Sequence, residues 1–214
     1  RQGQNDTGLL LAQLYFELGE YPLTLNLTKR ILDGSPPVGI QARALNILAT
    51  VESTLNMHKA AASTFNQAYK ASEESGDVAM SMTILTNHLR HELDYENTDG
   101  ALAIGQQLFL LASTLEKHPE LVEVQISIGE LFVRLADQAS DSSYYRHALV
   151  NLQQAELAAE RRGQVRLQSY AIGHQGRLLI TQGKLNEGIR RLNTANFLAN
   201  SVRSFESAYL WQWQ

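Results

Sequence analysis

Apolar residues in this chain are spaced for helix faces. Leu11 is followed four residues later by Tyr15, and after a break at Gly19 a second apolar face runs to Ile31 and Leu32. Alternating runs of β-branched residues, which are typical of strands, are few, and the sequence holds no Asn-Gly hairpin turn. The pattern therefore predicts an all-α protein of ten full helices and a partial eleventh, arranged as antiparallel pairs.

The helix-pair pattern repeats along the chain. A small residue is expected where the two helices of a pair approach closely, and it recurs at Ala12, Ala49, Gly129 and Gly176, with Leu89 as a poor match. Turn residues that tolerate the left-handed backbone conformation follow at Gly19, Asn56 and Gly183. A longer polar connection is expected at 138–143. The repeat interval is 37 to 47 residues, from the positions of the small residue.

This frame resembles the tetratricopeptide repeat (TPR), whose standard length is about 34 residues. It predicts one α-solenoid domain over 1–214, wound as a right-handed superhelix with the first helix of each pair lining a concave face. Five repeats and a truncated sixth are expected at roughly 5–38, 39–76, 77–117, 118–163, 164–203 and 204–214. Because the sequence opens on Arg1 and closes on Gln214 without a stop signal, we expect a fragment of a longer protein.

The amino-acid composition excludes several kinds of chemistry and of partner. Hydrophobic residues make up 44% of the 214 residues, which is enough for a core, and the absence of cysteine excludes disulfides and thiolate chemistry in this chain. A net charge of −4 gives no general attraction to nucleic acids or anionic membranes, and no apolar run reaches the length of about 18 residues that a membrane span needs. The second half holds a group of arginines without interleaved aromatic residues, which favours a solvated surface over a nucleic-acid patch. These are Arg161, Arg162, Arg166, Arg177, Arg190 and Arg191.

No catalytic or cofactor site is predicted. His88 and His91 are three residues apart beside Glu92, whereas a zinc hydrolase places its histidines four apart with a third ligand, so solvated helix histidines are favoured over a metal site. The Gly173-x-x-Gly176 pair falls inside a predicted helix, so it indicates close helix packing rather than a phosphate loop. We therefore predict a protein that is not an enzyme and that binds no metal or cofactor.

An extended groove is the expected binding surface of such a fold. Groove-facing positions of the first helices are predicted at Gln13, Phe16, Asn46, Thr50, Arg90, Glu130, Tyr170 and Arg177, with Leu9, Ile126, Val133, Gly173 and Ile180 beside them. Chaperone-binding TPR domains hold a carboxylate with Lys and Asn at positions that are Leu9, Gln13 and Ile47 here. A receptor for chaperone tails is therefore not expected.

The C-terminal third shows a closer resemblance. Residues 168–173 read Gln-Ser-Tyr-Ala-Ile-Gly, Gly176 and Gly183 follow, and residues 208–214 read Ala-Tyr-Leu-Trp-Gln-Trp-Gln. This segment is similar to the TPR arrays that precede CHAT domains, the caspase-like domains associated with TPRs in bacterial proteins. The chain departs from that pattern at His174, Gln175, Leu179 and Gly188. The resemblance implies a bacterial protein with a caspase-like Cys/His protease domain downstream, whose catalytic residues have no counterpart here.

The resulting hypothesis is a non-catalytic interaction scaffold that binds a protein or peptide segment and serves a downstream caspase-like domain, with the cytoplasm as the favoured compartment. The alternative is a regulatory TPR domain that senses a short peptide, which should enclose its ligand with several convergent Asn side chains. The partial last helix is expected to lack its covering helix. Leu210, Trp211 and Trp213 are therefore predicted to be exposed and to support self-association.

Overall fold

The computed structural model describes residues 2–112 and 121–212, and it is all-α over that part, with no strand. Of these described residues 86% are helical, which confirms the predicted fold class. Eleven helices are present in the described ranges: α1 (Gln2–Glu17), α2 (Tyr21–Asp33), α3 (Val38–Thr54), α4 (His58–Ser75), α5 (Val78–Asp94), α6 (Thr98–Ala112), α7 (Val122–Ala139), α8 (Ser143–Arg161), α9 (Val165–Thr181), α10 (Leu185–Ser201) and α11 (Phe205–Gln212).

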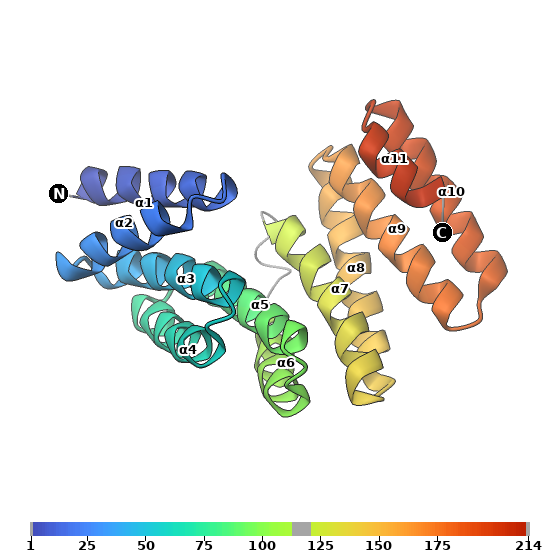
Figure 1. Ribbon diagram of the computed structural model, residues 1–214. Helices are drawn as coiled ribbons and strands as arrows, with labels where there is room; N and C mark the ends of the chain where they lie inside the picture. Colours follow the sequence, from blue (N-terminus) through green and yellow to red (C-terminus); the bar gives the residue numbers. More distant parts are fainter. Residues whose placement is uncertain (1, 113–120, 213–214) are drawn as a thin grey trace. The chain divides into compact units, whose positions relative to one another are not determined.

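The helices form two compact units (Figure 1). Unit 1 comprises residues 1–104, with α1 to α5 and the start of α6, and unit 2 comprises residues 105–214, with the rest of α6 and α7 to α11. Within the units, consecutive helices such as α3 and α4, or α9 and α10, run side by side as antiparallel pairs. The single domain over 1–214, its repeat boundaries and its superhelical course stay predictions.

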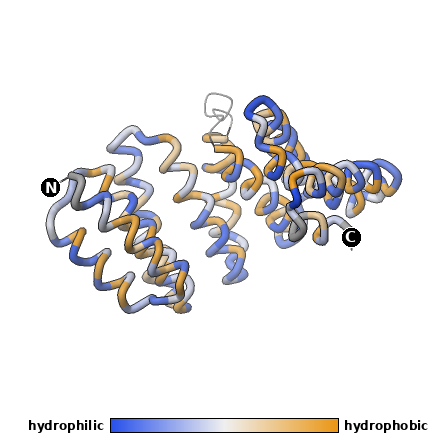
Figure 2. Tube along the Cα trace, turned by 90° about the horizontal axis from the view of Figure 1, so that it is seen from above, coloured by the Kyte–Doolittle hydropathy of each residue, from blue (hydrophilic) through white to orange (hydrophobic). Residues whose placement is uncertain are grey.

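Apolar and polar positions alternate along each helix, so that each helix has a face for the core (Figure 2). In unit 1, the pair α3 and α4 is held by a fully buried set that includes Ala42, Ala49, Ala61 and Phe65. Alanines on both helices let the backbones lie close, and the single large ring fills the space between them. The close-approach role predicted for Ala49 is thus confirmed by its complete burial.

In unit 2, glycine replaces alanine at the same close-approach position. A Cβ atom at Gly129 of α7 would lie 2.6 Å from Cγ of Leu152 on α8. At Gly176 of α9 it would lie 3.0 Å from the carbonyl oxygen of Gly188 on α10, and at Gly188 it would lie 2.7 Å from the carbonyl oxygen of Gly176. Two glycines therefore face each other where α9 and α10 are closest, which confirms that Gly176 serves helix packing.

The turns between paired helices reuse one geometry. Gly19, Asn56 and Gly183 have φ angles of 77°, 59° and 78°, as predicted, in the left-handed region. The amide of the next residue reaches back over the turn, as when Lys184 N donates to the Leu179 carbonyl oxygen at 2.9 Å. This bond satisfies a carbonyl at the helix end and reverses the chain within three residues.

Gly188→Ala tests the close approach of α9 and α10. The added methyl would contact the Gly176 carbonyl oxygen and Ile180, so we expect the free energy of unfolding to fall by about 1–3 kcal/mol, less the gain of up to about 1 kcal/mol in helix propensity. Gly39→Ala on α3 is the matched control, because its nearest neighbour atom, Cβ of Ser75, would be 3.9 Å away. Urea denaturation followed by circular dichroism should show a loss for the first and a small gain for the second. An equal gain for both would contradict the packing.

Candidate functional site

Unit 1 contains an open groove of about 830 Å³ that runs over the first helices α1, α3 and α5. Five of the residues predicted to face a partner line it together: Gln13, Phe16, Asn46, Thr50 and Arg90. The remaining lining residues are Asp6, Leu9, Leu10, Arg43, Ile47, Met80, Thr83 and Asn87. Each of the three helices ends in a turn with a left-handed residue, at Gly19, Asn56 and Glu96.

A hydrogen-bonded polar strip crosses the middle of this groove. Asn87 Nδ2 donates to Asn46 Oδ1 at 3.2 Å, and Arg90 Nη1 donates to Asn87 Oδ1 at 3.0 Å. Asn46 is buried, and Asn87 and Arg90 are half-buried, so the strip joins α3 to α5 at the floor of the groove. The amides and guanidinium keep further donors and acceptors that are not used in these two bonds. Asn87 was not predicted.

Apolar side chains border the polar strip. Leu9 is buried beneath the groove, whereas Leu10 is 71% exposed on its wall, and Phe16 and Met80 are half-buried. An exposed leucine beside fixed amides is suited to a ligand with one apolar side chain and an extended backbone, because the backbone needs hydrogen-bond partners at regular intervals. The groove therefore combines apolar side chains that can anchor a ligand with polar groups that can orient it.

The groove carries few charges. Arg43 Nη1 lies 4.0 Å from Asp6 Oδ1, and both side chains are about half exposed. A pair of this length in solvent contributes little to stability, so both groups are free to interact with a ligand at small cost. Arg90, held only by the amide of Asn87 among the contacts of the described residues, is the other cation of the groove.

A side pocket of about 430 Å³ adjoins the groove and shares Phe16, Thr50, Asn87 and Arg90 with it. Its other walls are polar and aromatic: Ser53, Thr54, Asn56, His58, Phe65, His91, Asp94 and Tyr95. The rings of His58 and Tyr95 are stacked with centroids 3.6 Å apart. This pocket joins the groove to the packed interior between α3, α4 and α5.

The expectation of solvated histidines at 88 and 91 is wrong. His88 is 2% exposed and His91 is 3% exposed, because their face of α5 packs against α4, with Phe65 stacked on His88 at 5.1 Å. His88 Nε2 lies 3.0 Å from Glu92 Oε1, and His91 Nδ1 lies 2.8 Å from Ser53 Oγ. Both histidines belong to one helix as expected, but the sequence does not show that a neighbouring helix covers them.

Burial and hydrogen bonding shift two pKa values in this region. Loss of hydration lowers the pKa of His91 below its ordinary value. The hydrogen bond from His88 lowers the pKa of Glu92, and a second bond from Asn97 Nδ2 to Glu92 Oε2, at 2.6 Å, acts in the same direction. Glu92 is therefore an ionised carboxylate in the interior of unit 1 at neutral pH.

The residues predicted in unit 2 do not gather in one groove. Glu130 on α7 pairs with His174 Nε2 on α9 at 2.7 Å, and Arg177 is exposed. Tyr170 lines a shallow pocket of about 190 Å³ with Ile126 on α7. Unit 2 thus offers separate small surfaces, whereas unit 1 brings its predicted residues together.

The predictions that Trp211 is exposed and that Gly173 faces the groove are wrong. Trp211 is 4% exposed, because its ring packs on Gly173, where a Cβ would lie 2.5 Å from the indole. Its Nε1 donates to Ser169 Oγ at 3.1 Å, so α11 is fixed to α9. Gly173 therefore packs against the following helix instead of facing a groove. Leu210 is 43% exposed as predicted, and Trp213 lies outside the described residues.

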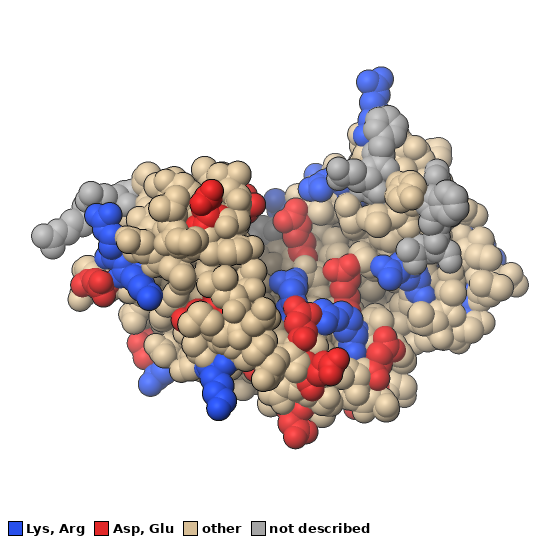
Figure 3. All heavy atoms as spheres, viewed as in Figure 1, with Lys and Arg blue, Asp and Glu red and all other residues tan. Residues whose placement is uncertain are grey.

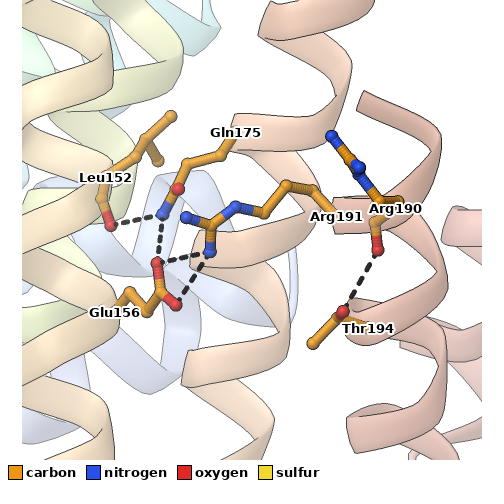
Figure 4. A network of polar contacts seen from close by, with 6 residues as sticks. All are labelled: Leu152, Glu156, Gln175, Arg190, Arg191 and Thr194. Carbon is orange, nitrogen blue, oxygen red and sulfur yellow. Dashed lines mark hydrogen bonds and ion pairs between the residues drawn. The ribbon is translucent and has the colours of Figure 1, made fainter. Parts of the chain in front are cut away.

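Unit 2 is also joined by a polar network that the sequence did not reveal (Figure 4). Gln175 Nε2 on α9 donates to the Leu152 carbonyl oxygen at 3.1 Å and to Glu156 Oε2 at 2.8 Å, both on α8. Arg191 on α10 donates through Nη1 to Glu156 Oε1 and Oε2 at 3.0 and 3.1 Å. One carboxylate therefore joins three consecutive helices, and its role is structural.

Surface charge shows no single-sign concentration on the face seen in Figure 3, where Lys and Arg side chains are interspersed with Asp and Glu. No group of three metal-ligating side chains occurs within residues 2–112 and 121–212. In the same ranges, no helix combines the length and apolar character that crossing a membrane requires.

Comparisons with known proteins place the fold. No protein-family model matches the sequence, and no curated protein matches it significantly. A crystal structure from Podospora anserina, described as a kinesin light chain with nearly identical TPR-like repeats, is similar with a TM-score of 0.68 and 11% identity, over 94% of this chain and 97% of that one. A thermophilic TPR protein from Thermus thermophilus is similar with a TM-score of 0.62 and 17% identity, over 95% of this chain and 98% of that one. The chain therefore has the fold of TPR repeat proteins.

Trp211→Ala tests the position of the C-terminal helix. Removing the buried indole leaves a cavity against Gly173 and leaves Ser169 Oγ without one partner, so we expect the free energy of unfolding to fall by about 3–5 kcal/mol. Phe197→Ala, which truncates an aromatic residue of α10 that is 73% exposed, is the control and should change it little. If both variants unfolded at the same urea concentration as the wild type, Trp211 would not be buried.

Proposed function

We propose that this protein is a non-catalytic interaction scaffold whose unit 1 groove binds an extended segment of a protein partner. The observation that carries this proposal is the groove over α1, α3 and α5, where the strip of Asn46, Asn87 and Arg90 lies beside the exposed Leu10. TPR folds commonly bind proteins or peptides, which supports the proposal. A peptide backbone offers alternating donors and acceptors, and the fixed amides of the strip offer both.

The volume of the groove favours a peptide segment over the surface of a folded protein as the ligand. A space of about 830 Å³ is at the upper end of the range for small-ligand sites, and it is open along its length. Specific recognition of a folded partner needs roughly 800 Å² of buried surface on each side, most of it outside such a groove. An extended segment uses the groove itself, with Leu10 and Phe16 as the walls for its apolar side chains.

A finer proposal concerns the role of the scaffold in the whole protein. The similarity of 168–176 and 208–214 to TPR arrays that precede CHAT domains supports a bacterial scaffold that recruits partners to, or regulates, a downstream caspase-like protease domain. The sequence encoded after Gln214 tests this directly. A caspase-like domain with its Cys and His would support the proposal, and an unrelated domain would overturn it.

The second candidate is a regulatory domain that senses a short peptide. Asn87 favours it, because with Asn46 it makes two convergent amides in one groove where the sequence indicated one. The two candidates differ in ligand length. A sensor should bind a short free peptide as tightly as the same residues placed inside a longer segment, whereas a scaffold should gain affinity from the flanking residues.

Peptide binding can be tested with the 214-residue chain. Random peptides displayed on phage are selected on the wild-type protein, and the best one is synthesised and measured by fluorescence anisotropy. Leu10→Glu should weaken binding at least tenfold, about 1.4 kcal/mol, because it places a charge on the apolar wall of the groove. Leu18→Glu is the control, since Leu18 is 66% exposed in the turn just after the same helix and does not line the groove. Equal affinity of the two variants for the selected peptide would overturn the proposal.

We also propose that the protein self-associates through the C-terminal helix. Trp211 is left out of this contact surface because it is buried. The exposed apolar residues Tyr209 and Leu210 on α11 support it. Sedimentation velocity over a range of protein concentrations should show a dimer that Leu210→Glu dissociates, while Leu185→Glu, at an exposed position of α10, leaves it intact. A wild-type protein that stays monomeric at the highest concentration would contradict this proposal.

A further inference from the structure

We propose that the histidine cluster of unit 1 (His58, His88 and His91) is a pH-sensitive device that loosens the packing of α4 against α5 in mildly acidic solution. The inference concerns the stability of unit 1 and does not depend on what the groove binds. The cluster consists of three imidazoles on two helices, packed around one aromatic core.

The three rings lie within one small volume. Ring centroids are 5.6 Å apart for His58 and His91 and 6.5 Å apart for His88 and His91. Phe65 stacks on His88, and Tyr95 stacks on His58, so aromatic surface replaces part of the water around these rings. His58 and His91 also line the side pocket.

The hydrogen bonds of the cluster place a carboxylate beside His88 and a hydroxyl beside His91. Glu92 accepts from His88 through Oε1 and from Asn97 through Oε2, so an imidazolium at His88 has a carboxylate beside it. On His91, Nδ1 has only the Ser53 hydroxyl, and the Nδ1 atoms of both His58 and His88 are buried without a hydrogen-bond partner among the described residues. A positive charge on more than one of these rings would place like charges about 6 Å apart.

The charged groups around the cluster offset the loss of hydration of His91 only in part. Glu92, which is paired with His88, raises the pKa of His91, but loss of hydration outweighs it. Arg90 and Asp94 of α5 line the side pocket that His58 and His91 face, one of each sign. From α3 the cluster receives the neutral hydroxyl of Ser53, next to Glu52. From α4 it receives the apolar ring of Phe65 and His58, whose backbone is hydrogen-bonded to His91 and raises the pKa of His91. The lowered pKa of His91 agrees with this arrangement.

The direction of the pH dependence follows by linkage. In the unfolded chain each histidine takes up a proton below about pH 6.5, whereas in the folded unit a buried histidine with a lowered pKa stays neutral. The unfolded state then binds more protons, so stability is fully present above pH 6.5 and is lost as the pH falls. Between about pH 7.5 and pH 5.5, each histidine that stays neutral raises the opening equilibrium roughly tenfold.

Hydrogen exchange with mass spectrometry on the 214-residue chain tests the proposal. Exchange rates are divided by the intrinsic rates at each pH, which gives protection factors for peptides from α4 and α5. We expect these factors to fall at least tenfold between about pH 7.5 and pH 5.5. In His91→Gln the fall should shrink, because Gln keeps a hydrogen bond to Ser53 and does not titrate. His174→Gln, in unit 2, is the matched control and should leave the fall in α4 and α5 unchanged.

A direct titration keeps the proposal testable if His91→Gln does not fold. Proton NMR of the wild-type imidazoles gives each pKa, and the proposal requires His91 to titrate below the range of an exposed histidine. Protection of α4 and α5 that does not change with pH, or a His91 that titrates at an ordinary value, would overturn it.

Discussion

The structure depends on how closely two helices of a pair can approach. Ala49 in α3 and Gly129 in α7 stand where the partner helix is nearest, and Gly176 faces Gly188 where α9 meets α10. At these points the backbone itself is the contact surface, so even one added methyl has no space. In unit 1, one face of each first helix, α1, α3 and α5, lines the groove.

The sequence predicted the features that depend on local constraints. Gly19, Asn56 and Gly183 adopt the left-handed conformation because few other residue types do so at low cost, and Gly176 packs against a helix as its position in the pattern indicated. Five of the residues assigned to partner binding line one groove in unit 1 because helical periodicity decides which side chains share a face.

What the sequence could not reveal are contacts between one pair of helices and the next. His88 and His91 look like solvated polar residues in the sequence, yet α4 covers them, and Trp211 is covered by α9 through Gly173. The network of Glu156, Gln175 and Arg191 has the same origin. Such polar residues are buried because a specific partner lies on another helix, and the pattern of a single helix does not identify that partner.

Polar groups in the interior give unit 1 its specific character. A purely apolar interface between α3, α4 and α5 would be insensitive to pH and would leave the groove without oriented amides. Asn46 and Asn87 instead hold each other at the groove floor, and the histidine cluster lies directly behind the shared wall at Arg90. The proposed binding groove and the proposed pH-sensitive cluster therefore share helix α5.

The most direct test of the central claim is to map which backbone amides a bound peptide protects from hydrogen exchange. Hydrogen exchange of the chain, with and without a peptide selected on it, should show added protection in α1, α3 and α5, at the residues that line the groove. Protection restricted to unit 2, or to the second helices α2 and α4, would show that the ligand binds elsewhere and would contradict the account.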